Sequence, residues 1–239
     1  NPGVIAPFTL NDGSAYVADE AFARFSLSGA IEGYSIRGGV AYAWGSYTAN
    51  GLGTASTYPS IVKRFDGGDL DNVVSLFPFQ SGRYDGCVRR ADRSTWCFGP
   101  YNQNTTAQPL YRDGVGTLLL GIKTLTSPYR PSCALLDDAS VWCRGARSTG
   151  FLGNGTSSPG ETAIFSEVSS LGTSARDVRS VDQTACAILD SGEVTCWGNN
   201  DRGFLARGDI GGFDALAGRS RVKLVGGVTL AGAVEFVWP

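Results

Sequence analysis

Six cysteines fall into three pairs with one spacing, and this repeat constrains the fold more than any other feature of the sequence. Each second cysteine follows the first by ten positions, and the pairs are Cys87 and Cys97, Cys133 and Cys143, and Cys186 and Cys196. Each pair encloses two short apolar runs around a turn, and a glycine stands two residues after each second cysteine. Three such segments in phase indicate an internal repeat whose units are cross-linked.

The segment between the cysteines of a pair is typical of a β-hairpin. In the third unit, an apolar run leads from Cys186 to a turn at Asp190-Ser191-Gly192, and a second run leads to Cys196. A hairpin centred on Ser191 places the two cysteines opposite each other, where antiparallel side chains are close enough for a disulfide. Disulfides within hairpins therefore explain the spacing, whereas metal-binding cysteines stand two to four residues apart.

Segments without cysteine also match the hairpin pattern. Residues 39–45 match residues 192–198, with Trp44 aligned to Trp197, and further hairpins are expected over residues 10–17 and 230–238. Three units lack the turn glycine and are predicted to use another turn or to tolerate about 1–2 kcal/mol of strain; the residues in its place are Arg93, Ala139 and Ala233.

The distance between units predicts the size of each sheet. The glycines that end the full units are Gly45, Gly99, Gly145 and Gly198. Their spacing of about 50 residues corresponds to one four-stranded antiparallel sheet of a β-propeller. We therefore predict an all-β propeller of about five blades, or alternatively six. Pairing of the chain termini in one sheet would close the ring and remove exposed strand edges.

These units predict a single propeller domain over residues 1–239. The expected repeat units are 25–70, 71–116, 117–170 and 171–220, with 1–24 and 221–239 forming the closing blade. The chain contains no methionine and begins Asn1-Pro2-Gly3, which is expected of a processed end or of a piece of a longer precursor.

The repeat resembles that of the regulator of chromosome condensation family, a β-propeller family. In that family, a strand of small residues and leucine leads through a D-G turn to a Val-x-x-Trp-Gly strand and then to a loop ending G-x-L-G. Residues 187–198 fit the two strands and the turn, and loops at 50–53, 150–153 and 203–206 fit the ending, although alanine replaces the last glycine in the third loop. The resemblance covers roughly residues 30–210 and implies the propeller fold.

The resemblance does not carry the nucleotide-exchange role of the family to this chain. The histidine that commonly precedes the first strand in the family is missing, and so are basic loops suited to a nucleosome. The paired cysteines instead resemble secreted members of this repeat class.

The absence of histidine removes the commonest general base and rules out Ser–His–Asp and Cys–His catalysis. We therefore assign no catalytic residue, no cofactor and no metal. Asp66, Asp69 and Asp71 offer carboxylates of the kind that bind calcium, but they lack the EF-hand spacing and are interpreted as solvated turn carboxylates.

Charge and hydropathy exclude two further classes of protein. The formal net charge is −2, and lysine and arginine form no sustained run, so we expect no nucleic-acid partner. No apolar stretch is long enough to span a membrane.

Disulfides persist outside the reducing cytosol, which predicts an extracellular or cell-surface glycoprotein. Asn104 and Asn154 begin N-glycosylation sequons, and both are expected in the surface loop that follows the second hairpin strand. Four tryptophans align on repeat strands and are expected to pack between blades. Loop tyrosines are the better candidates for a contact surface, and they are Tyr47, Tyr58, Tyr101, Tyr111 and Tyr129.

These observations favour a non-enzymatic extracellular structural or interaction protein whose loops bind protein partners or further copies of the chain in an assembly. The segment 228–239 would be available to pair with a neighbour if it did not close its own ring. The alternative is a carbohydrate-binding, lectin-like propeller that uses the loop tyrosines. A secreted glycan-processing enzyme has less support, because it would need two facing carboxylates that the sequence does not identify.

Overall fold

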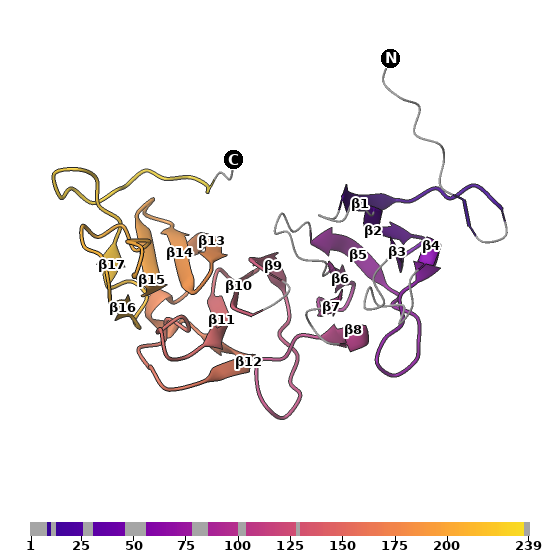
Figure 1. Cartoon of the computed structure of the whole chain (residues 1–239), viewed down its shortest axis with the longest axis horizontal. Helices are drawn as coiled ribbons and strands as arrows, with labels where there is room; N and C mark the ends of the chain where they lie inside the picture. The colour runs from indigo at the N-terminus through magenta and orange to yellow at the C-terminus, as the bar shows by residue number, and fades with distance from the viewer. Residues whose placement is uncertain are drawn as a thin grey trace, which may run out of the picture. The chain divides into compact units, whose positions relative to one another are not determined.

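In the computed structural model, nearly all regular structure in the described part of the chain consists of short β-strands (Figure 1). The structure describes residues 9–10, 13–25, 31–45, 56–77, 86–99, 104–127 and 130–236. These residues contain one short 3-10 turn, Ser169–Leu171. The chain divides into two compact units, Asn1–Leu110 and Tyr111–Pro239, and each is described separately.

The first unit contains two four-stranded antiparallel sheets. The strands of the first sheet are β1 Glu20–Phe25, β2 Ile31–Arg37, β3 Val40–Gly45 and β4 Ser56–Ile61. Those of the second are β5 Val73–Phe77, β6 Gly86–Arg90, β7 Thr95–Gly99 and β8 Asn104–Pro109. In both sheets neighbours in sequence are neighbours in space, so each sheet is a simple up-and-down meander.

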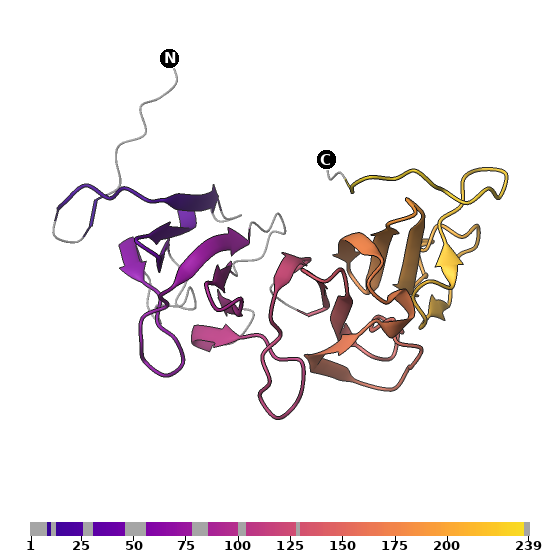
Figure 2. The same ribbon diagram turned by 180° about the vertical axis from the view of Figure 1, so that it is seen from behind.

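The second unit also contains two sheets (Figure 2). The strands of the third sheet are β9 Ile122–Leu125, β10 Ser132–Leu136, β11 Val141–Ala146 and β12 Glu161–Glu167. Those of the fourth are β13 Ala175–Val181, β14 Thr184–Leu189, β15 Val194–Asn199, β16 Phe213–Asp214 and β17 Ser220–Arg221. Both β16 and β17 pair with β15, so together they take the place of one fourth strand.

Adjacent sheets pack face to face within each unit, because inward residues alternate along every strand. In the first unit the interface is formed by Tyr34, Ile36, Ala41 and Ala43 from the first sheet and by Val88, Trp96 and Phe98 from the second. In the second unit it is formed by Cys133, Leu135, Val141 and Cys143 from the third sheet and by Val178, Ala185, Ala187 and Trp197 from the fourth. Trp197 and Trp96 therefore lie between sheets, as the sequence predicted for the aligned tryptophans.

Two expected boundaries differ from the observed ones. Strand β1 pairs with β2 from Glu20 onward, so residues 20–24 belong to the first sheet and not to a closing blade. The hairpin expected over residues 230–238 is wrong, because residues 230–236 form no strand. Closure of the ring by the chain ends stays a prediction, and residues 1–8 and 237–239 lie outside the described residues.

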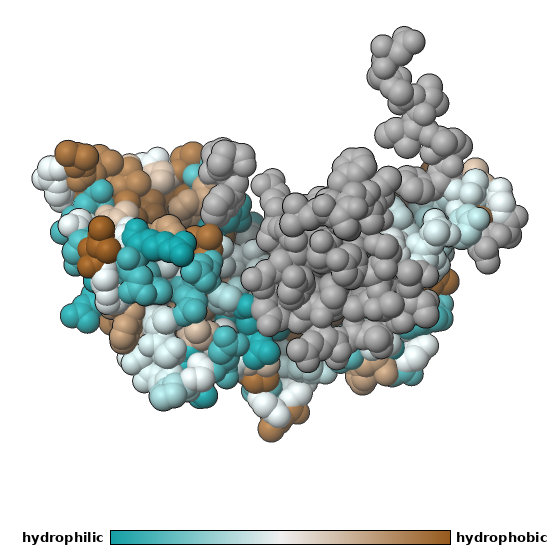
Figure 3. Space-filling model, viewed as in Figure 1, coloured by the Kyte–Doolittle hydropathy of each residue, from teal (hydrophilic) through white to brown (hydrophobic). Residues whose placement is uncertain are grey.

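The C-terminal segment, residues 222–236, covers the outer face of the fourth sheet. Its residues Val222, Leu230, Ala233 and Phe236 pack against a cluster of Ile188, Val194, Cys196 and Leu205. The N–H of Ala233 donates to the carbonyl of Gly192 in the β14–β15 turn at 3.0 Å. Figure 3 shows apolar residues gathered at the upper left over this segment, where Val225 and Val228 are exposed.

The three disulfide-bearing hairpins share one turn, although only one of them has glycine in it. The third turn residue is left-handed in each case, with φ of 68° at Arg93, 67° at Ala139 and 79° at Gly192. The N–H of Ala139 donates to the carbonyl of Leu136 at 3.0 Å, as that of Gly192 does to Leu189 at 2.8 Å. The sequence allowed either a different turn or a strained residue in the hairpins without glycine. The structure shows the second: Arg93 and Ala139 adopt the left-handed conformation of Gly192.

The Ala139→Gly variant is expected to be more stable than the parent by up to about 1 kcal/mol. Glycine removes a left-handed penalty of about 1–2 kcal/mol but loses about 0.5–1 kcal/mol of backbone entropy. Gly192→Ala is the matched control and is expected to destabilise, because its Cβ would lie 2.8 Å from the nitrogen of Gly232. Urea unfolding followed by circular dichroism measures both changes. A loss of stability in the first variant would contradict the turn.

Candidate functional site

The three disulfides are placed by strand register. Within each hairpin the paired cysteines stand directly opposite each other, with Cα atoms 4.1, 4.1 and 4.0 Å apart in chain order. Such short spacing belongs to non-hydrogen-bonded antiparallel pairs. In the first sheet the corresponding opposed pair is Tyr34 and Ala43, which packs against the second sheet without a cross-link.

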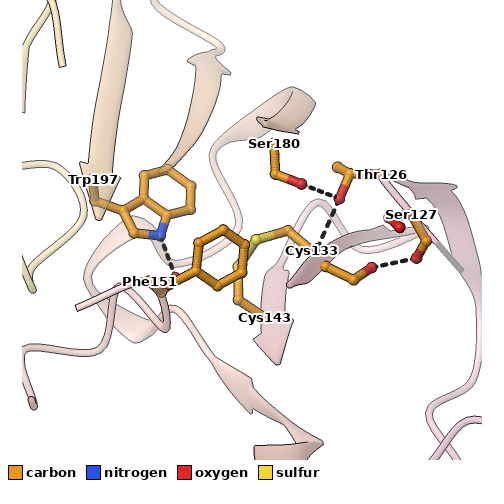
Figure 4. Close-up of a disulfide and its surroundings, with 8 residues drawn as sticks. Thr126, Ser127, Cys133, Cys143, Phe151, Ser180 and Trp197 are labelled. Atoms are coloured by element: carbon orange, nitrogen blue, oxygen red, sulfur yellow. Dashed lines mark hydrogen bonds between the residues drawn. A yellow bond between two sulfur atoms is a disulfide. The ribbon is translucent and has the colours of Figure 1, made fainter. Parts of the chain in front are cut away.

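The Cys133–Cys143 disulfide lies at the centre of the second unit (Figure 4). Both cysteines are fully buried with Phe151 and Trp197, and the indole Nε1 donates to the carbonyl of Phe151 at 3.0 Å. Thr126 accepts the N–H of Cys133 at 2.9 Å, which fixes the start of β10. The bridge is thus a structural element of the sheet interface and not an accessible redox centre.

The final glycine of the G-x-L-G loop has a packing role here. Gly153 has φ of 66°, and a Cβ at this residue would lie 2.6 Å from the indole Nε1 of Trp197. The loop after β11 can therefore approach the tryptophan of the next sheet only without a side chain. Ala206 takes the corresponding place after β15.

A repeated hydrogen-bond relay joins the turn to a tryptophan in the second and third sheets. In the second sheet, Asp92 Oδ1 accepts the N–H and hydroxyl of Ser94 at 2.9 and 2.5 Å, and Trp96 Nε1 donates to Ser94 Oγ at 3.0 Å. Asp138, Ser140 and Trp142 repeat this arrangement. Burial raises the pKa of Asp92, but the bonds from Ser94 outweigh it and hold the pKa below its usual value.

Two of the five candidate contact tyrosines lie among the described residues. Tyr58 is 41% exposed but lies on strand β4 and not in a loop as expected. Tyr111 is half-buried in the second unit, where it bridges to Leu118. Tyr47, Tyr101 and Tyr129 lie outside the described residues. The contact role of all five tyrosines stays a prediction.

The two sequons differ in their local structure. Asn154 lies in the loop between β11 and β12, where its Oδ1 accepts the N–H and hydroxyl of Thr156 at 3.1 and 2.7 Å. Both hydrogen bonds are accepted by Oδ1, so they do not involve Nδ2, the atom that receives a glycan. Asn104 is the first residue of β8 and pairs with Gly99, so it does not lie in a free loop as expected.

The acidic residues considered for calcium form ion pairs instead. Asp69 pairs with Lys63, Asp66 pairs with Arg64 at 3.2 Å, and Asp71 pairs with Arg90 at 2.9 Å. Across the described residues, no group of three or more histidine, cysteine or acidic side chains is arranged to hold a metal ion. Helices long and apolar enough for a membrane crossing are likewise lacking in that part of the chain.

A pocket of about 550 Å³ lies in the second unit, and no sequence motif indicates it. It is lined by Ser170, Leu171, Ser174, Leu189, Leu216, Ala217, Gly218, Arg219 and Arg221. The residues come from the turn after β12, the end of β14 and the segment between β16 and β17. Its apolar lining and its two arginines make it a candidate binding site of this unit.

Comparison with protein-family models matches residues 175–203 to the Regulator of chromosome condensation (RCC1) repeat. These residues are β13, β14, β15 and the start of the following loop. No curated protein sequence matches the chain.

Solved structures match far more of the chain. Prp20p from Saccharomyces cerevisiae, studied with its binding properties to Gsp1p and histones, is 12% identical with a TM-score of 0.57 over 92% of this chain and 58% of that one. Human WBSCR16 is 20% identical with a TM-score of 0.55 over 85% and 56%. Yeast RCC1 (Prp20) bound to Kap60 is 14% identical with a TM-score of 0.57 over 82% and 47%.

At these identities the likeness shows the fold. The chain spans about half the length of the solved structures it matches. The prediction of an all-β propeller of four-stranded antiparallel sheets is confirmed, and four sheets with further terminal segments agree with about five blades.

Proposed function

We propose that this chain, an RCC1-repeat β-propeller protein, is a non-enzymatic scaffold that works outside the cytosol and binds protein partners through its loops. The observation that carries the proposal is the set of three disulfides, one in each of three successive hairpins and all with little or no exposure except at Cys186. Such bonds form and persist in oxidising compartments. They add rigidity to a platform whose loops are left to vary.

The solved relatives support binding as the general role. Prp20p is described by its binding to Gsp1p and histones, and yeast RCC1 (Prp20) was solved with Kap60 bound. For this chain we propose a protein partner or a further copy of the chain in an extracellular assembly. The net charge of −2, together with the ion pairs that Lys63, Arg64 and Arg90 form in the described part of the first unit, favours a protein partner over nucleic acid.

Photo-cross-linking tests this proposal. A photoreactive phenylalanine analogue at Tyr58, which is exposed on β4, is expected to cross-link to a partner chain in the protein's own extracellular material. The second test position for the same group is Val181, which is 46% exposed at the end of β13 in the other unit. Partner cross-links at neither position, or recovery of the chain only from the cytosol, would contradict the proposal. A carbohydrate array tests the lectin alternative on the same material.

Asn154 is expected to carry an N-linked glycan when the protein is secreted by a eukaryotic cell. The sequon lies in a loop, and Asn154 is only half-buried. Asn154→Gln should remove the part of the glycosidase-sensitive mass that this residue carries, whereas Thr156→Ser keeps the sequon and should retain it. Intact-mass measurement before and after glycosidase treatment distinguishes the two variants. An unchanged mass in both would contradict modification at this residue.

A further inference from the structure

The pocket of the second unit exists because the last strand of the fourth sheet is interrupted. Strand β16 pairs with Gly198 and Asn199, and β17 pairs with Thr195 and Cys196, so residues 215–219 leave the sheet between them. Four of the displaced residues, 216–219, line the pocket together with residues of the turn after β12.

Hydrogen bonds hold the displaced segment in place on both sides. The carbonyl of Ala215 accepts the N–H of Gly155 at 2.7 Å, and the N–H of Ala217 donates to the carbonyl of Gly153 at 3.0 Å. On the other side, the N–H of Gly218 donates to Thr195 Oγ1 at 3.0 Å. The pocket is therefore formed before any ligand binds, which lowers the entropic cost of binding.

The floor of the pocket is apolar. Leu171, Leu189 and Ala217 are 6%, 8% and 1% exposed, and Leu216 is 39% exposed at the edge. A lining of leucine and alanine fits an aliphatic side chain, and Leu216 adds apolar surface at its edge.

Two arginines make one side of the pocket positive. Arg221 is oriented by the carbonyl of Gly218 at 2.5 Å and by Glu193, whose Oε2 lies 3.5 Å from its Nε. Arg219 is exposed and forms no ion pair with any described residue. One positive charge beside the apolar floor is thus left uncompensated, and a carboxylate is the group that complements it.

The hydroxyl groups of Ser170 and Ser174 in the pocket lining are acceptors toward a ligand. Ser170 donates its proton to the carbonyl of Ala217 at 2.7 Å, and Ser174 donates to that of Leu171 at 2.6 Å. Their remaining lone pairs can accept N–H groups, which a peptide backbone supplies.

We propose that this pocket binds a segment of a partner protein in which an acidic side chain stands next to a bulky aliphatic one. The carboxylate pairs with Arg219, the aliphatic side chain packs on Leu171 and Leu189, and backbone N–H groups donate to Ser170 and Ser174. The inference rests on the proposed function, because it assigns a partner chemistry to one surface of the propeller.

The test is a chemical-shift titration of the isotope-labelled full chain with capped peptides. The probes are acetyl-Gly-Leu-Glu-Leu-Gly-amide, the same peptide with lysine in place of glutamate, and 4-methylpentanoate as a free aliphatic acid. We expect the glutamate peptide to bind at least ten times more tightly than the lysine peptide, with shifts at the pocket residues. Equal binding of both peptides would overturn the proposal, and equal binding of the free acid would overturn the assignment to a peptide.

Arg219→Glu is the decisive variant, and Arg202→Glu is its matched control. Both arginines are exposed in the second unit, but Arg202 does not line the pocket. Arg219→Glu should weaken glutamate-peptide binding at least tenfold and favour the lysine peptide, whereas Arg202→Glu should change neither. An equal loss of glutamate-peptide affinity in the two variants would show that only the net charge of the protein matters, and it would overturn the proposed site.

Failure of this inference can be told apart from failure of the proposed function. Partner cross-links at Tyr58 together with no peptide preference would contradict the proposed ligand of the pocket and support the scaffold proposal. Peptide binding that depends on Arg219, with no cross-links at either tested position, would support the proposed ligand of the pocket and contradict partner binding at the two tested positions.

Discussion

Replacing Trp197 with alanine is expected to lower the free energy of unfolding of the second unit by about 3–5 kcal/mol. Trp197 is fully buried between the third and fourth sheets, together with Phe151 and the Cys133–Cys143 disulfide. The variant would leave a large cavity and an unpaired carbonyl at Phe151, which accepts the indole N–H at 3.0 Å. The cavity and the lost hydrogen bond both lower the free energy of unfolding.

Two further variants separate these contributions. Trp197→Phe keeps much of the apolar volume and loses the N–H donor, so we expect a smaller loss than for alanine. Trp142→Ala is the matched control on β11, because its side chain is only half-buried and its Nε1 donates to Ser140 at 3.2 Å. Urea unfolding measured by far-ultraviolet circular dichroism compares all three. Equal losses for Trp197→Ala and Trp142→Ala would contradict the packing described for the sheet interface.

Removing the Cys133–Cys143 disulfide is expected to cost about 3 kcal/mol of stability, since it closes a loop of roughly ten residues in the unfolded chain. The double variant with alanine at both positions is preferred to serine, because both sites are fully buried and a hydroxyl there would need a hydrogen-bond partner. The lost sulfur packing against Phe151 adds to the effect of the longer unfolded chain.

Unfolding in urea with and without a reducing agent measures this contribution. The parent chain should lose stability on reduction, and the double variant should lose less because one of its three bridges is already absent. A double variant as stable as the oxidised parent would show that the bridge does not constrain the unfolded state.

The hairpins could be predicted from sequence because their signals are local. The ten-residue spacing, the turn and the alternating strands together determine which cysteines face each other, and the observed register agrees. The left-handed turn at Ala139 was one of two options, since a penalty of about 1–2 kcal/mol is small enough for the surrounding sheet to impose.

The pocket and the C-terminal segment could not be predicted in the same way. The pocket depends on an interruption at residues 215–219, and nothing in their periodicity distinguishes a displaced segment from a short strand. Residues 230–236 carry a turn-like glycine, Gly232, but their apolar side chains pack on the disulfide face of the fourth sheet and form no hairpin. Tertiary packing here overrides the local pattern.

The central claim is that three successive blades are each cross-linked across one hairpin, which is the basis for the proposal that the protein works outside the cytosol. Peptide mapping of the native, unreduced protein tests this claim directly. The account predicts linked peptides for 87–97, 133–143 and 186–196, with an intact mass lower by six hydrogens than that of the reduced chain. Free thiols in the native material, or a cysteine of one blade linked to a cysteine of another, would contradict it.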